Sequence, residues 1–125
     1  MRKAVLLLII TKIIILLSLT ILKASSEISD NSIWVKCTPI SKNNHIVWKL
    51  ESEREIDFYT IEVSHDAKTY FKLVDVSSYG NSEKEIVYSF LHKNAGSAIS
   101  IYRIVQISKS GEIAYSKTFN NKTDL

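Results

Sequence analysis

The chain has 125 residues, of which 46% are hydrophobic, so it is long enough for one folded domain and too apolar to be intrinsically disordered. Its formal net charge is +3, but Arg2, Lys3, Lys12 and Lys23 lie within the first 26 residues, and removing these four charges leaves −1. Because a nucleic-acid-binding domain carries its basic excess on the folded part, this distribution argues against nucleic acid as a partner.

Residues 1–26 are predicted to be an export signal, with a basic start, a long Leu/Ile-rich run and small residues at its end. If Lys12 closes the basic part, the apolar core is 13–22, ten residues, and cleavage follows Ser26. If instead residues 4–22 form one span, its nineteen residues are long enough to anchor the chain in a membrane. The central lysine then costs about 2.5–3.5 kcal/mol. We favour the cleaved signal, with the uncleaved anchor helix as the alternative.

Seven short stretches with the composition of β-strands follow a polar spacer at residues 27–32. The predicted strands are 33–38, a second one with Ile46, Trp48 and Leu50 facing inward, then 58–64, 70–76, 85–91, 99–108 and 113–119. Residues 120–125 are predicted to be a polar tail.

The spacing of these strands predicts the fold of residues 33–119. Short strands at even intervals without an amphipathic helix are typical of a two-sheet antiparallel sandwich. The stretch 99–108 is apolar on both faces, which indicates a strand inside a sheet rather than at its edge. Trp48 is too large to leave outside so small a core, so we expect it to be buried between the sheets.

Several weak motifs occur together in one order. They are Trp48, Ser52-Glu53, the aromatic strand 57–64, the turn Asp66-Ala67-Lys68, and the run 102–107 before Gly111 and Tyr115-Ser116. Together they resemble a fibronectin type III-like domain of the kind found in secreted and surface proteins of Bacteroidetes, over residues 48–119. The resemblance implies a seven-stranded immunoglobulin-like sandwich, and it implies no catalytic residue and no cofactor.

This sequence differs from the family's pattern in two respects and matches a known feature of immunoglobulin-like sandwiches in a third. Ala67 stands where the family usually has glycine, so we expect a different turn type there. The family's module usually precedes a sorting domain for type IX secretion, and we expect that domain to be missing because the chain stops at Leu125. Tyr102 matches the tyrosine corner of immunoglobulin-like sandwiches, so its hydroxyl is expected to bond a backbone group within residues 92–98.

The residue types that usually carry chemistry do not form a recognisable site. His45, His65 and His92 each lie beside a predicted turn and are expected to be exposed rather than to hold a metal. The single cysteine, Cys37, is expected to pack as a small hydrophobe, and the acidic run within residues 51–57 is expected to be a solvated connection. There is no nucleophile elbow or glycine-rich oxyanion loop, so the sequence predicts no enzyme.

Three aromatic residues are the candidate partner contacts. Tyr70 and Phe71 are adjacent and cannot both face inward on a regular strand, and Tyr79 lies in a loop. The resulting hypothesis is an exported, non-catalytic module of the periplasm, cell surface or exterior that binds an envelope protein or a glycan. The alternatives are an inner-membrane-anchored periplasmic domain with a structural role, or a small secreted enzyme or inhibitor.

Overall fold

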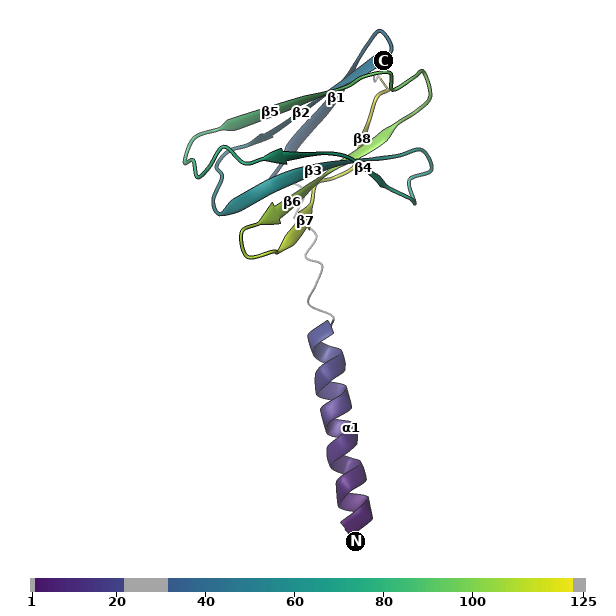
Figure 1. Ribbon diagram of the computed structural model, residues 1–125, viewed down its shortest axis with the longest axis vertical. Helices are drawn as coiled ribbons and strands as arrows, with labels where there is room; N and C mark the ends of the chain where they lie inside the picture. The colour runs from purple at the N-terminus through teal and green to yellow at the C-terminus, as the bar shows by residue number, and fades with distance from the viewer. Residues whose placement is uncertain (1, 22–31, 123–125) are drawn as a thin grey trace.

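The computed structural model describes residues 2–21 and 32–122 of the chain, as helix α1 and eight strands in two antiparallel sheets (Figure 1). The first sheet has the order β1-β2-β5, with β1 Trp34–Ile40, β2 Asn43–Leu50 and β5 Ile86–His92. The second has the order β4-β3-β6-β7, with β4 Phe71–Ser77, β3 Ile56–Ser64, β6 Ile101–Ser108 and β7 Ile113–Tyr115. β8, Phe119–Asn120, also pairs with β6. The predicted all-β sandwich of two antiparallel sheets is confirmed.

Helix α1 comprises Arg2–Ile21 and has Lys12 in its middle. No helix in the described part of the chain meets the length and hydropathy of a transmembrane span. The predicted cleavage after Ser26 and most of the spacer at 27–32 lie outside the described residues.

The sandwich has eight strands rather than the predicted seven, because the last predicted strand, 113–119, is divided into β7 and β8. Ser116 lies in the gap, where its backbone N–H donates to the Ile104 carbonyl at 2.8 Å. Its hydroxyl in turn accepts the Ile104 N–H at 2.8 Å, in the place of a backbone carbonyl. The ladder on β6 is therefore interrupted locally, while both pieces still pair with β6.

The start of the predicted polar tail belongs to the fold. Asn120 lies in β8, and the Asn121 side-chain oxygen accepts the Ser100 N–H at 2.9 Å. The Asn121 amide also donates to the Ala98 carbonyl at 3.1 Å. Residues 120 and 121 thus form hydrogen bonds with β6 and with the segment that precedes it, so they are part of the folded domain.

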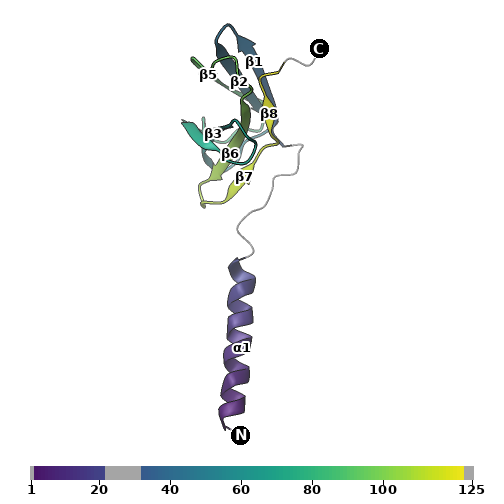
Figure 2. The same cartoon turned by 90° about the vertical axis from the view of Figure 1, so that its right-hand side faces the viewer.

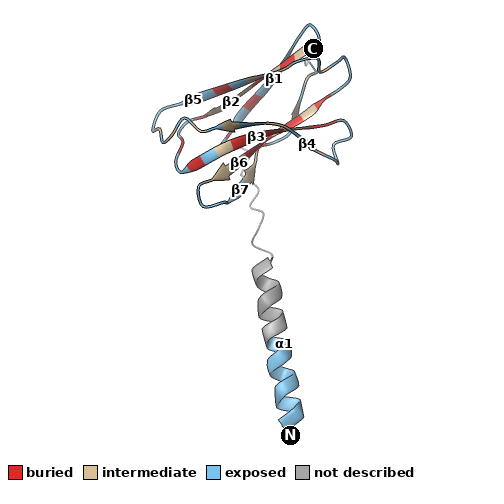
Figure 3. Cartoon of the chain, viewed as in Figure 1, coloured by how far each residue is buried: buried red, intermediate tan, exposed pale blue. Residues whose placement is uncertain are grey.

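The core lies between the two sheets, where buried positions alternate along the strands (Figure 3). On β2 every second residue is buried, including Ile46, Trp48 and Leu50 as predicted. Trp48 is fully buried and contacts Tyr59 edge-on, with ring centroids 5.8 Å apart. This alternation is the direct consequence of the two-residue repeat of a strand with one covered face.

β6 lies inside the second sheet, between β3 on one side and β7 and β8 on the other, as its two apolar faces predicted. Tyr102 and Ile104 are fully buried, and Val105 on the opposite face is 5% exposed. The strand begins at Ile101, two residues later than expected, and Ile99 is left exposed.

Ala67 itself adopts the left-handed conformation, with φ of +61°, in the turn between β3 and β4. This is the conformation that glycine adopts without strain, so alanine occupies here a backbone position that favours glycine. The preceding Asp66 carboxylate accepts the backbone N–H groups of Lys68 at 2.9 Å and Thr69 at 2.8 Å. These bonds lower the pKa of Asp66 to about 2 and hold the turn in place of the missing glycine.

The Tyr102 hydroxyl is buried, but its partners are side chains and not the predicted backbone group. It accepts the Asn44 Nδ2–H at 2.7 Å and lies 2.8 Å from Nδ1 of His92. His92 is therefore half-buried, which contradicts the expectation that all three histidines are exposed. Burial, followed by the charge of nearby His65, lowers the pKa of His92 below its ordinary value.

Candidate functional site

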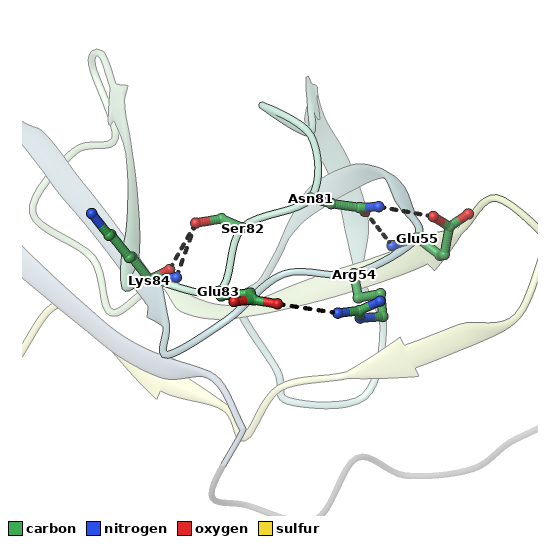
Figure 4. A network of polar contacts seen from close by, with 6 residues as sticks. All are labelled: Arg54, Glu55, Asn81, Ser82, Glu83 and Lys84. Carbon is green, nitrogen blue, oxygen red and sulfur yellow. Dashed lines mark hydrogen bonds and ion pairs between the residues drawn. The ribbon is translucent and has the colours of Figure 1, made fainter.

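Two connecting segments, 51–56 and 78–84, lie against each other at one end of the sandwich. Glu53 and Ser82 exchange two backbone hydrogen bonds of 2.8 Å and so form an isolated antiparallel bridge. The Asn81 side chain accepts the Glu55 N–H at 2.7 Å and donates to the Glu55 carboxylate at 3.0 Å (Figure 4). These bonds stabilise Glu55 in the left-handed conformation, with φ of +54°. They also join the two segments into one continuous surface.

The outer side of these segments is polar and exposed. Arg54 and Glu83 form an ion pair of 3.8 Å with both side chains in solvent, so it contributes little stability (Figure 4). A shallow hollow of about 320 Å³ lies beside Arg54, lined also by Leu50, Ile56 and Gln106. The surface therefore presents guanidinium, carboxylate and amide groups next to a small hollow of mixed polar and apolar lining.

Glu53 is buried, with 2% of its surface exposed, although the acidic run was expected to be solvated. Its carboxylate accepts the hydroxyl of Tyr88 at 2.6 Å and the hydroxyl of Ser78. Hydrogen bonds of this kind compensate a carboxylate for the loss of water. Burial, followed by the bond to Glu53, raises the pKa of Tyr88 to about 12. Burial and the same carboxylate also raise the pKa of Tyr59.

The buried carboxylate fixes the backbone that carries Tyr79. The Tyr88 hydroxyl accepts the Tyr79 N–H at 3.0 Å, while the Ser78 hydroxyl accepts the Gly80 N–H at 3.0 Å. The buried Glu53 carboxylate thus bonds both hydroxyls, of Tyr88 and Ser78, that accept backbone N–H groups at Tyr79 and Gly80. The sequence contained one signal for this site, the Ser52-Glu53 pair, but nothing in it indicated that Glu53 would be buried.

Three aromatic rings are stacked from the core to the surface. Trp48 and Tyr88 are nearly parallel, with centroids 5.2 Å apart and an interplanar angle of 9°. Tyr88 and Tyr79 are also nearly parallel, at 4.6 Å and 8°. Tyr79 ends the stack and is 74% exposed. Its ring is therefore held in a fixed orientation with its outer face available to a ligand.

The structure does not bring the three candidate contacts, Tyr70, Phe71 and Tyr79, into one surface. Phe71 is the first residue of β4 and is 61% exposed, whereas Tyr79 follows the last residue of that strand by two positions. Tyr70 is half-buried, with the Arg103 guanidinium 3.9 Å above its ring. Arg103 is held there by an ion pair of 2.6 Å with Glu62. Of the three, Tyr79 alone combines an exposed ring with a rigid support.

The described residues hold no group of three histidine, cysteine, aspartate or glutamate side chains placed to bind a metal ion. His45 is half-buried on β2 and His65 is exposed in the turn after β3. The hydrogen-bonded pair of His92 and Tyr102 lies beside Asn44, and no carboxylate of the described residues bonds to it.

Comparisons with known proteins give a structural likeness only. No family model matches the chain, and no curated protein matches it. Two crystal structures of the pectate lyase Pel3 from Pectobacterium carotovorum are similar in fold, with TM-scores of 0.57 and 0.58 and sequence identities of 11% and 9%. Each alignment covers 76% of this chain and 28% of the lyase chain. At such identities the similarity shows the fold alone, and the activity of the lyase is not transferred to this chain.

Proposed function

We propose that the chain is an exported, non-catalytic binding module of the fibronectin type III-like class, which meets its partner through Tyr79. The strand order supports this class: β1, β2 and β5 form one sheet, and β3, β6 and β7 form the other. In immunoglobulin-like sandwiches the first, second and fifth strands likewise lie in one sheet, and the third, sixth and seventh strands lie in the other. Here β4 joins β3 rather than β5, as expected of the fibronectin type III-like form.

One observation carries the binding role, namely the exposed ring of Tyr79 on its rigid stack. An aromatic side chain that is fixed before binding loses little conformational entropy when a partner arrives. Its face suits the C–H face of a sugar ring, and the exposed Arg54, Glu55, Asn81 and Glu83 offer hydrogen bonds to hydroxyl groups. We therefore propose a glycan of the cell envelope as the partner, with an envelope protein as the second candidate.

The binding role is tested on Tyr79 variants. The chain is screened on an array of envelope polysaccharides, and the strongest ligand is titrated by calorimetry. Tyr79→Ala is expected to weaken binding about 30-fold, the effect of losing 2 kcal/mol at a central aromatic contact. Tyr79→Phe keeps the ring and should bind nearly as the wild type does. Phe71→Ala, which removes another exposed aromatic ring at the other end of β4, is the matched control. If Tyr79→Ala binds as tightly as Phe71→Ala, Tyr79 is not the contact.

Export is tested separately, by the N-terminus of the mature protein. The apolar character of α1 supports a signal, and cleavage after Ser26 predicts Glu27 as the first residue. N-terminal sequencing of the protein recovered from cells decides this. A mature protein that begins at Met1 and sediments with membranes would favour the anchored alternative. Lys12→Leu is expected to increase retention in the membrane, because it removes the one strongly disfavoured residue of 4–22.

A further inference from the structure

The edge strands β1 and β8 lie side by side (Figure 2). Residues of both strands and of the segments beside β8 line a groove of about 540 Å³. Three lysines line it, namely Lys36 on β1 and Lys117 and Lys122 on either side of β8. None of its nine lining residues is acidic, and among the described residues these lysines have no ion-pair partner. The groove thus concentrates positive charge in a domain whose sequence after residue 26 carries a net charge of −1.

The edge of β1 that faces this groove has backbone groups available for pairing. Within the described residues β1 pairs with β2 alone, over its whole length. Ile40 and Asn43 flank a two-residue turn and therefore form a hydrogen-bonded pair, so the alternate residues Val35, Cys37 and Pro39 direct their backbone groups to the edge. Pro39 fits this assignment, because a proline in a strand is tolerated where its nitrogen faces away from the ladder.

Three of the residues that line the groove, Val35, Cys37 and Phe119, belong to the apolar core or pack against it. Val35 is 8% exposed, and Cys37 and Phe119 are half-buried. Burial raises the pKa of the Cys37 thiol to about 11. An extended segment laid along β1 would therefore place alternate side chains near these three apolar residues, in a groove that three lysines also line.

We propose that this groove binds an acidic polypeptide segment in extended conformation, which adds to β1 as an extra strand. The free edge supplies main-chain hydrogen bonds, as in other cases of strand addition, and the lysines select acidic side chains. A polysaccharide of the same charge has no peptide backbone whose N–H and C=O groups could pair in register with β1. The proposal does not depend on the glycan site at Tyr79.

The first test uses the purified full-length chain and a fluorescein-labelled nonapeptide of alternating glutamate and valine. Binding is followed by fluorescence anisotropy, and the peptide with lysine in place of glutamate is expected not to bind. Each exposed ion pair is worth about 1.4–5-fold in affinity, so reversing all three lysines should weaken binding roughly tenfold or more. The variant is Lys36→Glu, Lys117→Glu and Lys122→Glu together. The matched control reverses three exposed loop lysines, at positions 68, 84 and 109.

The second test asks whether the peptide pairs as a strand, and it leaves the protein unchanged. N-methylation of alternate peptide residues removes the N–H groups of one edge of the peptide only. One of the two methylated forms should lose binding and the other should keep it, because only one edge faces β1. If both forms bind like the parent, or if polygalacturonate competes as well as the peptide does, strand addition is overturned.

The third readout places the peptide in the groove. Cys37 is the only cysteine of the chain, so alkylation by N-ethylmaleimide reports on this position alone. The acidic peptide is expected to slow alkylation in proportion to its occupancy, and the lysine peptide is expected to have no effect. An alkylation rate unchanged at saturating acidic peptide would exclude the groove as its site.

Discussion

The hydrogen bond between Asn44 and the Tyr102 hydroxyl connects the two sheets, and removing this hydroxyl tests how much that bond stabilises the fold. Tyr102 is fully buried and Asn44 is 1% exposed, so the bond of 2.7 Å between them joins β6 to β2 across the core. Tyr102→Phe leaves the Asn44 Nδ2–H without that acceptor and without access to water. An unsatisfied buried donor costs about 1–3 kcal/mol. For a domain of this size each kcal/mol lowers the unfolding temperature by about 4–8 °C.

Urea denaturation of the wild type and of Tyr102→Phe measures the difference in their free energies of unfolding directly. The control is Tyr115→Phe, because the half-buried Tyr115 hydroxyl has no hydrogen bond among the described residues. It should change stability by less than about 0.5 kcal/mol. Asn44→Leu combined with Tyr102→Phe should cost less than the sum of the two single changes, since the partners are coupled. If Tyr102→Phe is as neutral as the control, the bond does not stabilise the fold.

Three further predictions concern the core, the turn after β3 and the pH response. Trp48→Ala should cost about 3–5 kcal/mol in chemical denaturation, and a near-wild-type midpoint would contradict the sandwich core. Ala67→Gly should stabilise by about 0.5–1 kcal/mol, because glycine adopts positive φ without strain; a loss of stability would show that the strain is absent. Because the folded pKa of His92 lies below 6.5, stability should be full above pH 6.5 and fall as the pH drops towards the lowered value. In His92→Gln this fall should be smaller, and an equal fall would assign it to other groups.

The strands and their inward faces could be predicted from the sequence, because they depend on a local two-residue repeat. Ile46, Trp48 and Leu50 alternate with polar residues, and their burial follows once one face of β2 is covered. The position of β6 inside its sheet was predictable for the same reason. The division of the last strand was not, because it depends on the Ser116 hydroxyl meeting Ile104 on another strand.

The candidate sites were decided by contacts between residues that are distant in the sequence. The burial of Glu53 requires Tyr88, 35 positions away, and the support of Tyr79 requires the same ring. The partner of Tyr102 is Asn44, 58 positions away, although the sequence predicted a neighbouring backbone group. The basic groove exists because the first and last strands of the sandwich lie side by side. Periodicity reports which face of a strand is covered, and only the tertiary structure decides which side chains meet across the core.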